Sequence, residues 1–170
     1  MIAAWENGRL VPVEKLEAHR RGLRHPAVSI FVNRRGSTLL QKRAAGKYHT
    51  PGLWANACCT HPEWGEDPAV CTARRLKEEL GVEGLKLQPS GRIEYRAALE
   101  QGLVEHEVVD LFTAEAGPEL RLRPDPAEVA ETRWIEASEL RREILAVPSR
   151  FAPWLRIYMI DAADRLIPAA

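Results

Sequence analysis

The chain has 170 residues, enough for one domain with one sizeable core. Its 24 Lys and Arg residues balance 24 Asp and Glu residues, so the net charge gives no footprint for nucleic acid or an anionic membrane. No segment approaches the roughly 20 apolar residues of a membrane span, and the start, MIAAWENGRL, lacks the basic and apolar regions of a secretory signal. We therefore predict a cytoplasmic protein with one compact domain, residues 1–170, that binds neither nucleic acid nor a membrane.

The first half of the chain predicts a hairpin, a loop and a helix. Apolar runs over residues 28–33 and 37–43 are joined by Arg-Gly, which is typical of two antiparallel strands. Gly and Pro residues punctuate a loop over residues 44–54. In the helix that follows, Asp67 is the expected N-cap, with Pro directly after it, and Gly81 ends the helix. We expect its buried stripe to consist of four residues at helical spacing, namely Ala69, Ala73, Leu76 and Leu80.

The second half predicts three more strands and two more helices. Residues 92–97 and 103–116 form a strand pair, and residues 129–136 form another strand. Ser138 is the expected cap of a short helix. An amphipathic helix follows Pro153, and its apolar, packing positions are Trp154, Leu155, Tyr158, Met159 and Ala162. Strands and helices alternate without regular βαβ units, which predicts an α/β (α+β) fold with a mixed β-sheet flanked by α-helices.

Two carboxylates lie on one predicted strand. Glu105 and Glu107 point to the same face, and His106 points to the other. Two carboxylates this close repel each other, so a buried pair needs a cation. The pattern leaves open whether this face is solvated or buried with Leu103, Val109 and Leu111.

Histidines supply further candidate metal ligands. His19 and His25 lie six residues apart, and His61 follows two cysteines. Three imidazoles with two carboxylates suit a borderline divalent ion such as Mn²⁺, Zn²⁺ or Fe²⁺, although this spacing is not itself a metal motif. We expect His49 to be an ordinary loop histidine and His106 a packing histidine.

The three cysteines, Cys58, Cys59 and Cys71, fit free thiols better than a disulfide framework. The sequence Cys58-Cys59-Thr60-His61 could open a zinc knuckle, but a structural zinc site usually needs a second ligand pair. Only Cys71 follows, inside the predicted helix. We therefore expect Cys71 and Cys58 to be small buried hydrophobic residues.

The helix segment RRLKEELGV, residues 74–82, resembles the Nudix box R-E-U-x-E-E-x-G-U, where U is aliphatic. Glu66 matches the upstream glutamate of the box. Thr60 replaces the initial glycine, and Arg75 replaces a glutamate that helps to bind the hydrolytic metal. The alternative is an ordinary charged helix face without a ligand.

Three longer motifs carry a family resemblance: TPGLWANACCTHP (50–62), ARRLKEELG (73–81) and EHEVVDL (105–111). With residues 14–25, they make the chain similar to the type I isopentenyl-diphosphate isomerases, a Nudix-fold family with a modified box. The resemblance implies a Nudix-like domain, a monomer, and isomerisation of isopentenyl diphosphate to dimethylallyl diphosphate through a tertiary carbocation. The alternative is a Nudix hydrolase that cleaves an organic or nucleoside diphosphate.

The resemblance also implies a set of site residues. One divalent transition metal, such as Mn²⁺ or Zn²⁺, would have five ligands, namely His19, His25, His61, Glu105 and Glu107. Mg²⁺ would arrive with the substrate diphosphate near Glu79. The bases that bind the diphosphate correspond to Lys15, Arg43, Lys47 and Arg75. Cys59 and Glu107 would form the acid/base pair, with Tyr95 assisting and Trp154 as the active-site tryptophan.

Overall fold

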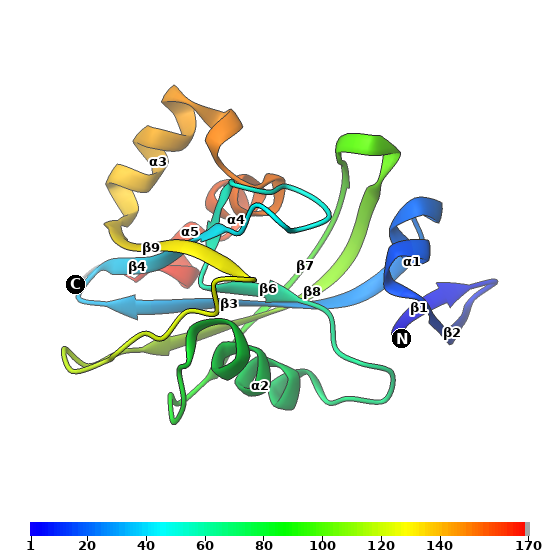
Figure 1. The fold of residues 1–170 in the computed structure, drawn as a ribbon, viewed down its shortest axis with the longest axis horizontal. Helices are drawn as coiled ribbons and strands as arrows, with labels where there is room; N and C mark the ends of the chain where they lie inside the picture. Colours follow the sequence, from blue (N-terminus) through cyan, green and yellow to red (C-terminus); the bar gives the residue numbers. More distant parts are fainter. Residues whose placement is uncertain (169–170) are drawn as a thin grey trace.

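In a computed structural model that describes residues 1–168, one mixed sheet forms the centre of the molecule and helices lie on both of its faces (Figure 1). The elements in chain order are β1 (Ile2–Glu6), β2 (Arg9–Val13), α1 (Lys15–Arg21), β3 (Arg24–Arg34), β4 (Ser37–Arg43), β5 (Trp54–Asn56), β6 (Cys58–Thr60), α2 (Pro68–Leu80), β7 (Gln88–Ala98), β8 (Val104–Glu115), β9 (Val129–Glu136), α3 (Ala137–Ala146), α4 (Pro153–Asp161) and α5 (Ala163–Leu166). The predicted class, a mixed sheet flanked by helices, is confirmed.

The sheet runs in the order β5-β4-β3-β8-β7, with β6 also paired to β3 and β9 to β4. Only the β3–β8 pair is parallel among the strand pairs of residues 1–168. The predicted hairpin of β3 and β4 is confirmed: Arg34 pairs with Ser37, and Arg35 and Gly36 both have positive φ angles, 50° and 75°. A two-residue turn with positive φ at both positions has a backbone twist that matches the right-handed twist of the strands it joins.

Hydrophobic side chains form a core on each face of the sheet. One core packs α3, α4 and α5 against β3 and β8, and the other packs α2 against the opposite face. The predicted buried positions of the terminal helix are confirmed, because α4 buries Trp154, Leu155, Tyr158 and Met159, and Ala162 follows it in the core.

Local signals set both ends of α2. The Asp67 side chain accepts hydrogen bonds from the backbone N–H groups of Ala69 and Val70, and Gly81 ends the helix with φ of 65°. A Cβ at Gly81 would lie 2.7 Å from the Cβ of Arg123, so glycine also permits close packing. The caps are as predicted.

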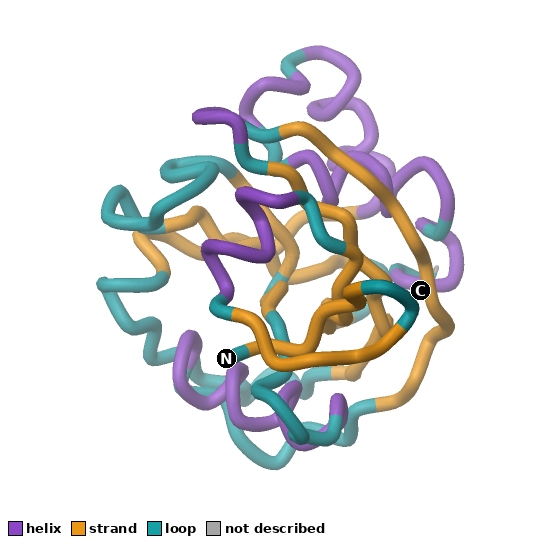
Figure 2. The backbone as a smooth tube through the Cα atoms, turned by 90° about the vertical axis from the view of Figure 1, so that its right-hand side faces the viewer, coloured by secondary structure: helices purple, strands orange, loops and turns teal. Residues whose placement is uncertain are grey.

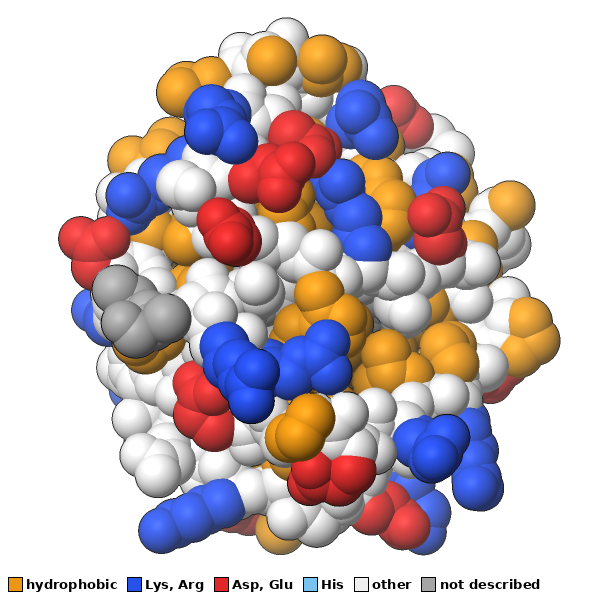
Figure 3. All heavy atoms as spheres, turned by 90° about the vertical axis from the view of Figure 1, so that its left-hand side faces the viewer, with side chains coloured by type: hydrophobic (Ala, Val, Ile, Leu, Met, Phe, Trp, Pro, Cys, Tyr) orange, Lys and Arg blue, Asp and Glu red, His pale blue; other side chains and the backbone are white. Residues whose placement is uncertain are grey.

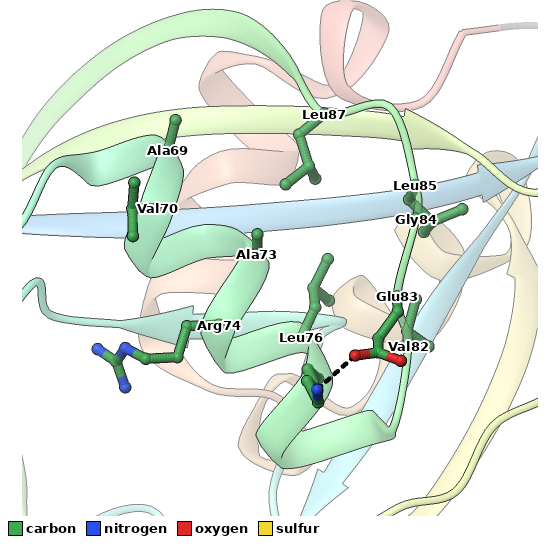
Figure 4. A pocket seen from close by; sticks show the side chains of 11 residues that line it. Ala69, Val70, Ala73, Arg74, Leu76, Val82, Glu83, Gly84, Leu85 and Leu87 are labelled. Atoms are coloured by element: carbon green, nitrogen blue, oxygen red, sulfur yellow. Dashed lines mark ion pairs between the residues drawn. The ribbon is translucent and has the colours of Figure 1, made fainter.

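The predicted buried stripe of α2 is partly wrong. Leu76 and Leu80 are buried, but Ala69 and Ala73 are exposed, and Cys71 takes the central buried position. The helix turns this face to β3 and β6, so its outer side forms an open groove of about 620 Å³ with the segment 82–87 (Figure 4). That groove holds none of the predicted site residues.

Two further segments differ from expectation. The N-cap of α3 is Glu136 rather than Ser138, because β9 continues directly into the helix and Ser138 lies in its first turn. The first 13 residues form an unpredicted hairpin, β1–β2, beside α1 (Figures 1 and 2).

None of the described helices is long and apolar enough to cross a membrane. Basic and acidic side chains are interspersed over the face in Figure 3, as the balanced charge predicts.

Candidate active site

A small polar cavity of about 30 Å³ lies where α1, β4, β6, α2, β8 and α4 meet. Its lining consists of Lys15, Arg43, Lys47, Tyr48, His49, Cys59, Thr60, His61, Arg75, Glu79, Glu105, Glu107 and Trp154. Ten of these thirteen are residues that the sequence analysis selected. The structure therefore brings together side chains that lie up to 139 positions apart in the chain.

The carboxylate face of β8 is buried, which answers the question that the strand pattern left open. Glu105 and Glu107 are each 2% exposed. The hydroxyl of Tyr95, which pairs with Glu107 across β7 and β8, lies within hydrogen-bond distance of both carboxyl groups, 3.0 Å from Glu105 Oε2 and 2.8 Å from Glu107 Oε2. His106 points to the other face, as predicted, with Nε2 3.4 Å from Glu94.

The two carboxyl groups have opposite pKa shifts. Burial, followed by the charge of Glu107, raises the pKa of Glu105 well above its usual range. Burial also opposes ionisation of Glu107, but His61 and His25 outweigh it and hold the pKa of Glu107 well below its usual range. Without a bound metal ion, the pair is therefore one neutral acid and one carboxylate, joined by the Tyr95 hydroxyl.

Three histidines converge on Glu107. The Nδ1–H groups of His19 and His25 donate to the backbone carbonyls of Lys15 and Leu23, each at 2.7 Å, which leaves Nε2 of each ring as the atom that can bind a metal ion. His61 Nε2 lies 3.1 Å from His25 Nε2 and 2.9 Å from Glu107 Oε1. Burial lowers the pKa of His19, and it lowers that of His61 to about 3.

This donor set fits a divalent metal ion. His19 Nε2 is buried without a protein hydrogen-bond partner. One ligand atom each from His19, His25, His61 and Glu107 lie within 4.8 Å of one another. Backbone carbonyls that fix the tautomer of a ligating histidine are the usual support of such a site. The fifth expected ligand, Glu105, belongs to an adjoining group with His19 and His49.

The profile of the NUDIX domain matches residues 23–155. The isopentenyl-diphosphate Delta-isomerase of Cereibacter sphaeroides is 59% identical to this chain, covering 98% of this chain and 94% of that relative. The corresponding protein of Rhodobacter capsulatus is 59% identical, with coverages of 99% and 96%. This chain belongs to the isopentenyl-diphosphate Delta-isomerase family.

Solved structures show the same fold at low identity. A MutT NUDIX hydrolase from Burkholderia pseudomallei has a TM-score of 0.64 and 21% identity, covering 82% of this chain and 98% of its own. A Deinococcus radiodurans protein has a TM-score of 0.66 and 15% identity, with coverages of 83% and 82%. The isomerase family thus shares its architecture with hydrolases, and the site must distinguish them.

Four basic side chains reach the cavity of this isomerase-family chain, namely Lys15, Arg43, Lys47 and Arg75. Burial, followed by the charges of the other three bases, lowers the pKa of Lys15. Arg75 donates to Glu79 at 2.6 Å, and Glu79 also accepts from Gln41 at 2.9 Å. Such a concentration of positive charge would attract a diphosphate.

Glu128 is a site residue that the sequence analysis missed. Its carboxylate pairs with Lys47 and lies 3.4 Å from Arg75. It precedes β9 without any motif around it, so no local signal could have identified it.

The thiol of Cys59 lies against α4. Cys59 Sγ is 3.9 Å from the hydroxyl of the fully buried Tyr158, one turn beyond Trp154. Burial, followed by the charges of Glu107 and Glu105, raises the pKa of Cys59 well above its usual range. The thiol therefore keeps its proton at neutral pH.

Cys58 points the other way. It is fully buried in the core beneath α2, together with Cys71, as expected for both residues. Tyr158 was expected only to pack, and its position four residues after Trp154 is the one signal that could have placed it at the site.

Proposed function

We propose that this protein interconverts isopentenyl diphosphate and dimethylallyl diphosphate by adding one proton and removing another through a tertiary carbocation. The observation that supports this best is a protonated thiol, Cys59, and a carboxylate, Glu107, that line one small cavity together with four bases. We also propose that the protein acts as a monomer.

The bases would anchor the diphosphate without cleaving it. Lys15, Arg43 and Lys47 surround the cavity, and Arg75 stands where a Nudix hydrolase has a metal-binding glutamate. A cation at this position binds the anionic diphosphate instead of the metal that hydrolysis needs. Binding energy from this remote group can offset the cost of positioning and desolvating the hydrocarbon.

The acid and the base would act on opposite faces of the small, flat alkene. Cys59 holds a proton, whereas Glu107 is ionised and keeps a hydrogen bond from Tyr95. The reaction is reversible, so each group can serve in either role, depending on direction. Glu107 is buried and Cys59 is half-buried, and a substrate that fills the cavity would exclude the water that could otherwise capture the cation.

The ligands of a divalent transition metal such as Mn²⁺ or Zn²⁺ would be His19, His25, His61, Glu105 and Glu107. Such an ion would neutralise the adjacent carboxylates and fix the orientation of Glu107. Glu79, held between Gln41 and Arg75, would lie beside the Mg²⁺ that accompanies the substrate diphosphate.

Two products decide between isomerase and hydrolase. The protein would be incubated with isopentenyl diphosphate and Mg²⁺, and dimethylallyl diphosphate and inorganic phosphate would be measured together. Isomerisation gives the first product without the second. Phosphate release without the isomer would instead establish a Nudix hydrolase.

Metal content tests the proposed ligands directly. Elemental analysis of purified protein is expected to find about one transition-metal ion per chain, because several neutral imidazoles and a carboxylate converge within 4.8 Å. His61→Ala should lose most of this metal, because His61 Nε2 is central to the group. Full metal content in a variant lacking His19, His25 and His61 would refute the site.

Trp154 is expected to stabilise the carbocation with its indole face. The residue is 2% exposed and lines the cavity, and the Arg43 guanidinium lies 5.3 Å from its ring centroid, so the ring already accepts a cation. A desolvated cation–π contact contributes about 2 kcal/mol, or roughly 30-fold in rate. Trp154→Phe should therefore retain far more kcat than Trp154→Leu.

Pyrophosphate affinity and thermal unfolding of both Trp154 variants serve as controls, because both substitutions keep apolar bulk. Similar values show that the variants fold and keep their diphosphate-binding bases. Equal kcat in the two variants would then make Trp154 a packing residue.

A further inference from the structure

The loop between β4 and β5, residues 44–53, brings one more imidazole to the metal ligands. His49 is 8% exposed, and its ring stacks on that of His19 with centroids 5.8 Å apart. Its Nδ1 lies 3.1 Å from the hydroxyl of Thr50, and Arg43 donates to its backbone carbonyl at 3.1 Å. Hydrogen bonds thus hold both the side chain and the backbone of His49.

A ring nitrogen of His49 lies close to two expected ligands. It is within 4.8 Å of ligand atoms of His19 and Glu105. His19 also belongs to the group of His25, His61 and Glu107, and the Tyr95 hydroxyl joins Glu105 to Glu107. The two groups therefore adjoin each other through His19, and His49 lies beside His19 and Glu105.

The backbone beside His49 is strained. Thr50 has φ of 47°, an outlier for a β-branched residue. Strain of this kind persists only where surrounding contacts over-determine it, and it gathers at ligand clamps. Here it directs the Thr50 hydroxyl to the His49 ring.

We infer that His49 is a sixth ligand of the metal ion and that it couples this ion to the diphosphate-binding loop. The inference rests on the proposed metal site of the isomerase and adds a residue to it. Six nitrogen and oxygen donors favour a six-coordinate ion such as Mn²⁺ over four-coordinate zinc.

The coupling follows from the short connection between His49 and Lys47. Lys47 lines the cavity and pairs with Glu128. A ligand bond at His49 would order the loop that presents Lys47, so metal binding should strengthen diphosphate binding. By linkage, diphosphate should strengthen metal binding by the same factor.

The test compares His49→Ala with His106→Ala, a matched control on the opposite face of β8 beside Glu94. Metal-free proteins would be loaded with Co²⁺, whose visible absorption reports the ligand set, and the affinity would be measured by chelator competition. We expect His49→Ala to change the spectrum and to weaken Co²⁺ binding about tenfold or more. His106→Ala should match the unmodified protein.

Calorimetry with inorganic pyrophosphate tests the coupling. Metal should tighten pyrophosphate binding to the unmodified protein, and this gain should disappear in His49→Ala. A gain that survives would refute the coupling, and an unchanged Co²⁺ spectrum and affinity would refute ligation by His49.

Two further comparisons keep these outcomes clear. If metal-free His49→Ala unfolds at a lower temperature than the unmodified protein, the same measurements on His49→Gln decide the result, because glutamine keeps the bulk and polarity of the side chain. Absence of Co²⁺ binding by the unmodified protein would contradict the proposed metal site itself, whereas binding that His49→Ala leaves unchanged contradicts only this inference.

Discussion

Cys59→Ser is expected to lower kcat for isomerisation by roughly 10²- to 10⁴-fold, the usual contribution of a positioned acid or base. Serine is similar in size to cysteine and has a hydroxyl in place of the thiol, but the hydroxyl proton is far less acidic than a thiol proton. The side chain lines the cavity but carries no positive charge for the diphosphate, which the four bases would bind. The value of KM and the metal content should therefore change little. Steady-state kinetics and elemental analysis give both quantities.

The neighbouring residue provides a matched control for the Cys59 substitution. Cys58 lies on the same short strand but points into the core beneath α2. Cys58→Ser should lower stability, because it adds a hydroxyl to an apolar core, yet leave the turnover of folded protein near normal. Loss of activity in Cys58→Ser with normal turnover in Cys59→Ser would show that the proton carrier is the other cysteine.

Local signals allowed much of the fold to be predicted. Asp67, Pro68 and Gly81 set the ends of α2 through hydrogen bonds within a few residues, and Arg35-Gly36 sets a hairpin through its own φ angles. Such features need no knowledge of distant segments. The buried face of α2 does depend on distant segments, because packing on β3 and β6 decides it, and Ala73 was consequently misplaced.

Prediction of the site from the sequence was limited in the same way, because burial and contacts between distant segments are not visible in local patterns. The strand period places Glu105 and Glu107 on one face, but it cannot tell whether that face is buried. The family motifs supplied the rest of the expected set. Residues that approach from elsewhere, such as His49 and Glu128, have no local signature, since only the folded chain brings them to the expected ligands and bases.

Glu107→Gln is expected to have an effect as large as that of Cys59→Ser, for two separate reasons. The substitution removes the carboxylate that would exchange the second proton. It also removes a charged metal ligand beside His61, which should weaken metal binding. Loss of the proton carrier alone should lower kcat by roughly 10²- to 10⁴-fold. Glutamine keeps the shape, and Tyr95 can still donate to Glu105, so the protein should remain folded.

Rescue by metal separates the two roles of Glu107. Glu105→Gln is the matched control, because Glu105 shares the Tyr95 hydroxyl and the same buried face, yet its raised pKa makes it a neutral acid when no metal is bound. Excess Mn²⁺ should restore metal content in both variants by mass action. It should restore turnover only in Glu105→Gln, because no metal concentration replaces a missing proton carrier. Near-normal kcat of Glu107→Gln in saturating Mn²⁺ would reduce Glu107 to a ligand and require another base opposite Cys59.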